Sequence, residues 1–267
     1  MTAIVPTSRV PPGHYGFRQA ARMEWIKLRT LRSVKWALLV ALAGMAGIGI
    51  AAGFNTRNAH GDVTNNILAG GALGQVVFAV LGVLVMTSEY SSGTIRAALA
   101  AVPRRPLVLA AKAAVFGAVA LAAGEVAAFV SFFAGGATLP HGIPAPALGQ
   151  PGVLRAVLLS GTSFCLIGLL GLGLGAIIRH SPAAIGVLVG GVYVLAQVIG
   201  AVAHGVRAYM PILIVGNSIS TTKPVSCGGP AGQCPQPLPA WTGLGMLCLY
   251  AAAALAAGGW LLARRDA

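Results

Sequence analysis

The chain has 267 residues, of which 57% are apolar and only 9% are charged, and its formal charge is +13 at pH 7. Soluble globular domains carry about 25% charged residues, so this composition excludes an ordinary soluble domain. It is typical of an integral membrane protein, for which the bilayer rather than water is the solvent.

The N-terminal region divides into a polar tail and an amphipathic helix. Residues 1–14 contain several prolines and predict a disordered tail. Residues 15–33 predict a helix lying on the membrane surface, with an arc of arginines beside an apolar arc that Glu24 interrupts. Such a helix would offer its arginines to anionic lipid head groups or to an acidic partner. A plain basic flank of the first membrane span is the alternative.

Six long stretches with almost no charge follow. A hydrocarbon layer of about 30 Å requires roughly 20 apolar residues in a helix. The stretches predict spans at about 35–55, 66–87, 108–134, 153–178, 182–203 and 240–262. The predicted fold class is therefore an all-α membrane protein with six transmembrane helices, which form one domain over residues 34–267.

The basic residues are distributed unevenly between the two sides of this predicted topology. One side receives 14 of the 18: Arg9, Arg18, Arg22, Lys27, Arg29, Arg32, Lys35, Arg96, Arg104, Arg105, Lys112, Arg179, Arg264 and Arg265. The other side receives Arg57, Arg155, Arg207 and Lys223. Because cytoplasmic loops carry the excess of Lys and Arg, both termini are predicted in the cytoplasm and the protein in the plasma membrane. This rule accounts for the positive charge without a nucleic-acid partner.

The segment between the second and third spans, residues 88–106, combines an acid, an aromatic, hydroxyls and bases. It contains Glu89, Tyr90, Gly93, Thr94 and Arg96. Gly93 predicts a turn into a short amphipathic helix that ends at a proline. The Glu89 carboxylate would pair with Arg96 or with a base on another protein, and a solvated loop acid is the alternative.

The last outer segment, residues 204–239, is rich in proline, and its apolar part at 208–216 is too short to cross the bilayer. It predicts a re-entrant element in the outer leaflet. Cys227 and Cys234 flank a Gly/Pro-rich turn in this segment. An external compartment permits a disulfide between them, and two unpaired loop thiols are the alternative.

Three polar residues within the predicted spans are candidates for a translocation path. Glu125 is the only acid inside a span, where a carboxylate is costly and therefore a functional candidate. A structural carboxyl bonded to Ser160, Thr162, Tyr193 or Gln197 is an equal alternative. Tyr193 and Gln197 share a helix face, which either lines a cavity or packs within the bundle. The histidines show no ligand spacing, so no metal site is predicted.

Two segments together resemble the permease subunits of the ABC-2 type transporter family. They are Glu24-Trp-Ile-Lys27-Leu-Arg29-Thr-Leu-Arg32 before the first span and Glu89-Tyr90-Ser-Ser-Gly93-Thr94-Ile-Arg96 after the second. The resemblance extends from about residue 15 to the end of the chain. It implies that the first segment is a connecting helix and that the second forms a coupling helix, which docks on a nucleotide-binding subunit.

The resemblance implies export driven by ATP. The sequence contains no Gly-x-x-x-x-Gly-Lys-Ser/Thr motif, so ATP and Mg are expected in a partner ATPase, with no cofactor and no enzymatic activity in this chain. A second permease chain and membrane lipids are the other expected partners, and the Ala/Gly-rich composition favours a bacterial source. An ATPase-independent secondary transporter or channel and a nontransporting scaffold are the alternatives from other classes.

Overall fold

Helices form all the regular structure in the described part of the chain. The computed structural model describes residues 16–57, 61–94, 105–195, 198, 199, 202, 208–221 and 238–264, and within these ranges there is no strand. The predicted all-α class is therefore confirmed for the residues described. The predicted tail (1–14) and most of the predicted coupling helix lie outside them.

Five of the helices are long and apolar enough to cross a bilayer. They are α2 (Arg32–Asn55), α4 (Gly71–Ser91), α6 (Arg105–Gly136), α7 (Val153–Ile178) and α11 (Ala240–Arg264). The chain is thus shown to have the helices of a multi-pass membrane protein. Four predicted spans differ from these helices by a few residues, and the prediction of 153–178 agrees with α7.

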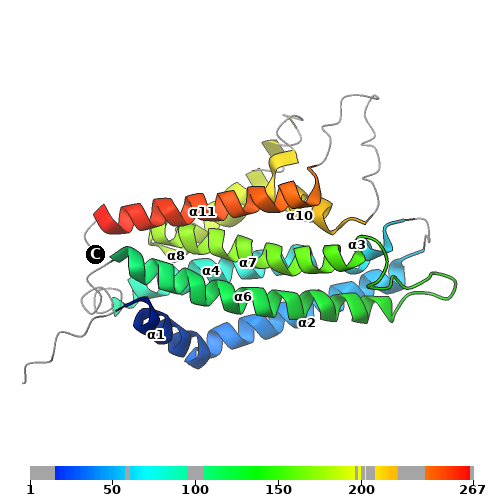
Figure 1. Cartoon of the computed structure of the whole chain (residues 1–267), viewed down its shortest axis with the longest axis horizontal. Helices are drawn as coiled ribbons and strands as arrows, with labels where there is room; N and C mark the ends of the chain where they lie inside the picture. Colours follow the sequence, from blue (N-terminus) through cyan, green and yellow to red (C-terminus); the bar gives the residue numbers. More distant parts are fainter. Residues whose placement is uncertain are drawn as a thin grey trace, which may run out of the picture.

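The predicted fifth span, 182–203, is described only in part. It begins as α8 (Ser181–Gly186) and continues as the π-helical segment η1 (Val187–Leu195). The end of α7 lies at one end of the bundle and the start of α11 at the other (Figure 1). The chain must therefore pass between the two ends after Ile178, but a sixth membrane-spanning helix stays a prediction.

The predicted surface helix is shorter than expected at both ends. It is α1 (Phe17–Thr30), and it stops at Leu31, whose extended backbone (φ −68°, ψ 109°) separates it from α2. Arg32, which was predicted within the surface helix, instead begins α2. The two helices meet at a sharp bend (Figure 1), so α1 folds back beside α6.

Two short helices complete the end of the bundle opposite α1. The start of the predicted second span is a separate helix, α3 (Val63–Ile67), because a turn at Leu68–Gly70 interrupts the helix. Asp62 caps α3 by accepting a hydrogen bond from the backbone N–H of Asn65. The apolar segment predicted as re-entrant contains α10 (Pro211–Ile219), which packs against α11 and α7.

Helices α4 and α7 form the centre of the bundle, where small residues allow close packing. A Cβ on Gly82 would overlap the backbone carbonyl of Gly168, and a Cβ on Gly171 would overlap that of Ala79. Phe78 and Phe164 stack across the same interface with ring centroids 5.6 Å apart. Helices that meet in lipid use small residues in this way because no hydrophobic force drives them together.

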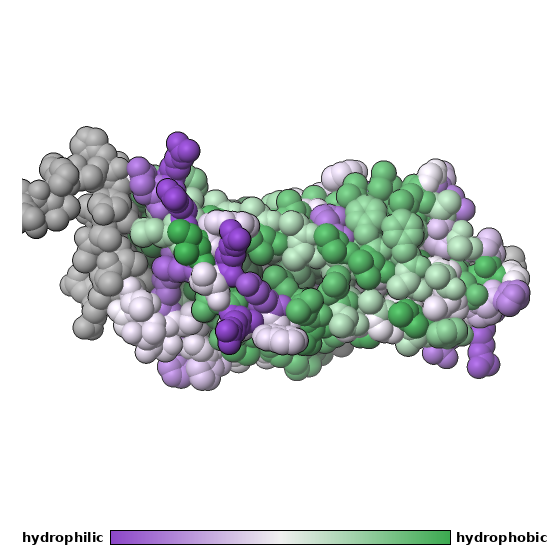
Figure 2. All heavy atoms as spheres, turned by 90° about the horizontal axis from the view of Figure 1, so that it is seen from below, coloured by the Kyte–Doolittle hydropathy of each residue, from purple (hydrophilic) through white to green (hydrophobic). Residues whose placement is uncertain are grey.

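The outer surface is apolar between two polar ends. Figure 2 shows a broad hydrophobic band on one face, with hydrophilic side chains gathered toward the ends. Large apolar side chains such as Trp36, Val40, Phe54 and Trp241 are exposed. Such a surface is unfavourable in water and suits contact with lipid chains.

The described basic residues are concentrated at the end of the bundle that holds α1. That end carries Arg18, Arg22, Lys27, Arg29, Arg32, Lys35, Lys112, Arg179 and Arg264, whereas Arg57 and Arg155 lie at the other end. Residues that the sequence assigned to one membrane side therefore share one end of the structure.

Candidate functional site

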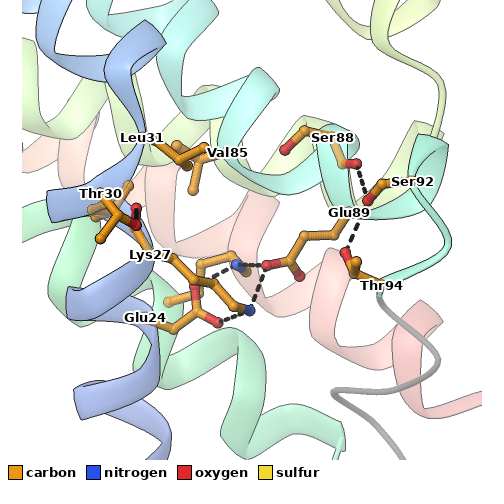
Figure 3. Close-up of a pocket in the computed structure, with 11 residues that line it drawn as sticks. Glu24, Lys27, Thr30, Leu31, Val85, Ser88, Glu89, Ser92 and Thr94 are labelled. Atoms are coloured by element: carbon orange, nitrogen blue, oxygen red, sulfur yellow. Dashed lines mark hydrogen bonds and ion pairs between the residues drawn. The ribbon is translucent and has the colours of Figure 1, made fainter.

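Four charged side chains form a closed ring at the end of the bundle that holds α1. Lys27 Nζ lies 2.9 Å from Glu24 Oε1 and 2.8 Å from Glu89 Oε1. Lys112 Nζ lies 2.7 Å from the same Glu89 oxygen and also pairs with Glu24 Oε2. We call Glu24, Lys27, Glu89 and Lys112 the ion-pair ring (Figure 3).

The ring joins three helices that are far apart in sequence. On α1 the buried residues are Ala20, Glu24 and Leu28, which recur every four residues, so Glu24 lies in the middle of the face packed on α6. Lys27 lies one turn further along α1. Glu89 lies in the last turn of α4, and Lys112 lies two turns into α6. The ring therefore fixes the end of α4 to α1 and α6.

The ring is electrically neutral and largely removed from solvent. The side chains of Lys112, Glu24 and Glu89 are 2%, 5% and 9% exposed, whereas that of Lys27 is 40% exposed. Burying single charges is costly, but alternating carboxylates and ammonium groups compensate one another. Lys112, Glu24 and Glu89 are thus the members that offset one another inside the protein, and removal of Lys112 leaves buried carboxylate charge without a buried partner.

The carboxylates also control the protonation of Lys27. Burial acts to lower the pKa of Lys27, but hydrogen bonds to Glu89 and Glu24, together with their charges, outweigh burial and raise the pKa above its ordinary value of 10.5. The ammonium form is therefore maintained throughout the physiological pH range. Lys27 is the most exposed member of the ring, so solvent or a partner would contact the ring at Lys27.

A cavity of about 410 Å³ opens beside the ring. The ring residues line it together with Leu28, Thr30, Leu31, Val85, Ser88, Ser92 and Thr94. Glu89 uses one carboxylate oxygen for both lysines, while its other oxygen, Oε2, is buried without a hydrogen-bond partner in the described part of the chain. The cavity thus combines two ammonium groups, hydroxyl groups and an incompletely bonded carboxylate.

The end of α4 forms the rim of this cavity. Ser92 donates to the carbonyl of Ser88 at 2.8 Å, and its hydroxyl lies 2.9 Å from that of Thr94 (Figure 3). Gly93 has φ +70°, a conformation that glycine adopts without strain, and it turns the chain out of the helix. The predicted turn at Gly93 is confirmed.

The Tyr90 side chain does not hydrogen-bond to the ion-pair ring and instead contacts Arg179. The guanidinium of Arg179 lies 5.3 Å from the centroid of the Tyr90 ring. Nearby, the hydroxyl of Ser181 donates to that of Thr87 at 2.7 Å. These contacts join the end of α4 to the junction between α7 and α8, so the last turns of α4 contact four other helices.

The structure brings together some of the predicted coupling residues and not others. Glu24 and Lys27, predicted from the connecting-helix segment, meet Glu89 from the predicted coupling segment. Arg29 and Arg32 are exposed and take no part in the ion pairs of the ring. Arg96, the predicted intramolecular partner of Glu89, lies outside the described residues. The Glu89 ion pairs that are described involve Lys27 and Lys112 instead.

Glu125 is held at the interface of α6 and α7, far from the ring. Its Oε1 accepts a hydrogen bond from the hydroxyl of Thr162 at 3.1 Å, which is one of the predicted partners. Gly161 provides the space for the carboxyl group, because a Cβ there would lie 2.5 Å from the Glu125 carboxyl carbon. This arrangement supports the structural alternative and leaves a role in transport a hypothesis.

Of the remaining predicted site residues, only Tyr193 lies in the described part of the chain. Tyr193 is buried in an apolar cluster with Ile167, Leu188 and Ile214, and not against Glu125. Gln197 and the predicted cysteine pair Cys227 and Cys234 lie outside the described residues. The disulfide and a shared Tyr193–Gln197 face therefore stay predictions.

Lys112 is the ring member that sequence reasoning missed. It was counted only as one of many basic residues flanking a span, although it is 2% exposed and bonds to both acids. A usable signal was present, because the chain has only five acidic residues and two of them, Glu24 and Glu89, lie in the segments that flank the first two spans. Carboxylates that become buried beside a membrane span need basic partners, so Glu24 and Glu89 could have directed attention to Lys112.

Asp62 organises a second polar cluster that was not predicted, at the opposite end of the bundle. Its carboxylate accepts hydrogen bonds from the backbone N–H of Asn65 and Thr221 and from the hydroxyls of Ser220 and Thr221. Arg155 donates to the Ser220 carbonyl at 2.8 Å. This cluster ties the end of α10 to the start of α3.

The described polar clusters supply ion pairs at one end of the bundle and hydrogen bonds around Asp62 at the other. No group of three or more His, Cys, Asp or Glu side chains in these ranges could hold a metal ion. Comparison of the sequence with protein-family models and with curated proteins finds no match. Inference about function therefore depends on the ring, the helices it joins and the resemblance noted above.

Proposed function

We propose that this chain is the membrane-spanning permease subunit of an ATP-driven exporter of the ABC-2 type, and that the ring end of the bundle receives a separate cytoplasmic ATPase. One observation carries the proposal: ion pairs join the two segments in which the resemblance to that family is concentrated. Glu24 and Lys27 come from the first segment and Glu89 from the second, 62 residues after Lys27. An ordinary positive flank of a span does not require such a connection.

The ring would allow a movement of the end of α4 to be transmitted to α1 and α6. In the proposed mechanism the ATPase contacts the chain just after Ser92 and moves the end of α4 when ATP binds. Because Glu89 is bonded to Lys27 and Lys112, α1 and α6 follow this movement. Because α1 leads into α2 through the single extended residue Leu31, the movement reaches the first span as well.

The remaining parts of the proposal follow from the family resemblance. Two permease chains would line a path between them, in the plasma membrane and with both termini in the cytoplasm. The charge asymmetry supports this orientation, because most of the described basic residues lie at the ring end. ATP and Mg would bind only to the partner ATPase.

The experiment is affinity purification of the tagged chain from its native membranes in a mild detergent. The proposal predicts that an ATP-binding polypeptide copurifies and that the complex hydrolyses ATP in a vanadate-sensitive manner. The charge-reversal variant Glu89→Arg should abolish export while the chain remains in the membrane, with Arg57→Glu at the opposite end as the matched control.

The outcome also separates the other classes of function. Transport that follows an ion gradient, in a preparation without an ATPase, would favour a secondary transporter or a channel. Export that is unaffected by Glu89→Arg would contradict a coupling role for the ring end.

A further inference from the structure

A second recess lies on the membrane-facing surface, between α6 and α11. It has a volume of about 470 Å³ and is lined by Pro106, Leu109, Ala110 and Ala113 of α6 and by Leu255, Ala256, Gly259, Trp260 and Ala263 of α11. We call it the α6–α11 groove. Its lining side chains are apolar apart from the indole N–H of Trp260, and small residues on both helices make it hollow.

The dimensions of the groove match one leaflet of a bilayer. From Leu255 to Ala263 the α11 side extends about 12 Å at 1.5 Å per residue. A single leaflet contributes about 15 Å of hydrocarbon, half of a layer of about 30 Å. The groove therefore begins at the ring end of the bundle and reaches most of the way to the bilayer midplane.

A cation lies at the polar end of the groove. The guanidinium of Arg264, in the last turn of α11, lies 4.4 Å from the centroid of the Trp260 ring. Trp260 lines the groove and is 54% exposed, so this contact positions the Arg264 charge at the groove's mouth. None of the ion pairs formed by described residues involves Arg264, since Glu24 and Glu89, the described carboxylates of this end, pair with Lys27 and Lys112.

We infer that the α6–α11 groove binds an anionic phospholipid, with an acyl chain along the apolar recess and the phosphate group at Arg264. An apolar slot alone would accept any lipid tail, but a cation at its polar end distinguishes head groups by charge. Trp260 fits this role because an indole ring favours the boundary between hydrocarbon and head groups. This inference does not depend on the proposed export function or on which end faces the cytoplasm.

The test uses Trp260 as a built-in reporter. A variant with Trp25, Trp36 and Trp241 replaced by Phe is reconstituted into phosphatidylcholine vesicles. Two vesicle preparations are compared: one contains brominated phosphatidylglycerol and the other contains the same mole fraction of brominated phosphatidylcholine. Both brominated lipids quench nearby indoles. Brominated phosphatidylglycerol should occupy the groove with about fivefold preference, because one basic residue near a membrane surface contributes about 1 kcal/mol.

Two substitutions separate the contribution of charge from that of shape. Arg264→Gln should remove the preference and leave quenching by the two lipids equal. Ala256→Leu should fill the groove and weaken quenching by phosphatidylglycerol while Arg264 is intact. A second single-tryptophan protein that retains only Trp241, at the other end of α11, is the matched control and should show no such preference.

Four results would overturn the inference. The first three are equal quenching of Trp260 by both lipids, a preference that survives Arg264→Gln, and displacement of the lipid by millimolar inorganic phosphate, which would indicate an anion site without a lipid chain. Weak quenching by both lipids would show that another protein surface covers the groove and would equally contradict it. Native mass spectrometry of the unsubstituted protein, compared with Arg264→Gln, provides a readout that needs no tryptophan replacement: only the former should retain phosphatidylglycerol.

Discussion

Substitution of Lys112 by methionine tests whether the ring holds the helices together. The Lys112 side chain is 2% exposed and bonds to both Glu24 and Glu89. Lys112→Met preserves most of its volume but leaves two buried carboxylates that share only Lys27. Removing one partner from a buried ion pair costs about 3–5 kcal/mol, because the remaining charge stays buried without compensation.

This magnitude converts into a measurable change in thermal stability. For domains of about 150–250 residues, 1 kcal/mol corresponds to about 2–4 °C, so the unfolding midpoint should fall by roughly 6–20 °C. The assay is heating of the detergent-solubilised protein followed by size-exclusion chromatography with tryptophan detection. Lys27→Met is the matched control, because Lys27 is 40% exposed and solvent screens its ion pairs.

A double variant adds a further test of the same reasoning. Glu89→Gln combined with Lys112→Met removes one negative and one positive charge, and it leaves Glu24 paired with Lys27. It should therefore be more stable than Lys112→Met alone, in contrast to the additive loss expected for independent sites. A midpoint for Lys112→Met that is no lower than that for Lys27→Met would refute the account of the ring as a buried, mutually compensating group.

Three further predictions concern other parts of the structure. Because the folded-state pKa of Lys27 is raised, its contribution to stability is complete below pH 10.5 and should be lost as the pH rises through the raised value; Lys27→Arg should keep its stability across that range in the same thermal assay. Gly82→Ala should prevent close approach of α4 and α7 and reduce the yield of folded protein, whereas Gly117→Ala, whose Cβ would lie at least 3.6 Å from its neighbours, should be tolerated. Glu125→Gln keeps an oxygen acceptor for Thr162, so the structural role predicts an unchanged thermal midpoint and full export; a loss of export at an unchanged midpoint would contradict that role and assign Glu125 to the path.

Hydrophobic length was the most reliable guide to the fold. The predicted span 153–178 has the same bounds as helix α7, which is flanked by two residues with positive φ, Gly152 (φ +85°) before it and Arg179 (φ +61°) after it. The second span was misplaced at its start because the apolar composition continues through Leu68–Gly70, although the backbone turns there. Composition predicts which residues can lie in the hydrocarbon layer. It does not reveal a turn whose backbone N–H and C=O groups are hydrogen-bonded to nearby residues.

The candidate site was predictable only in part. Glu24 interrupted the apolar arc of the surface helix and therefore seemed to weaken that prediction, but it is buried because Lys112 lies opposite it. A single sequence shows which residues share a face of one helix and not which faces meet. For the same reason the sequence does not distinguish Gly171 from Gly190, each of which lies four residues from another glycine (Gly175 and Gly186), although of these two only Gly171 lies against another backbone.

The most direct measurement of the central claim is photocrosslinking from Ser92 in native membranes. Ser92 is exposed at the rim of the cavity beside the ring, immediately before the segment proposed to dock. With a photoreactive amino acid at this position, we predict a covalent adduct with an ATP-binding polypeptide, and none from the same label at exposed Leu154 at the opposite end. Accessibility of residue 92 to membrane-impermeant reagents added outside intact cells, with no crosslink to an ATP-binding chain, would contradict the account.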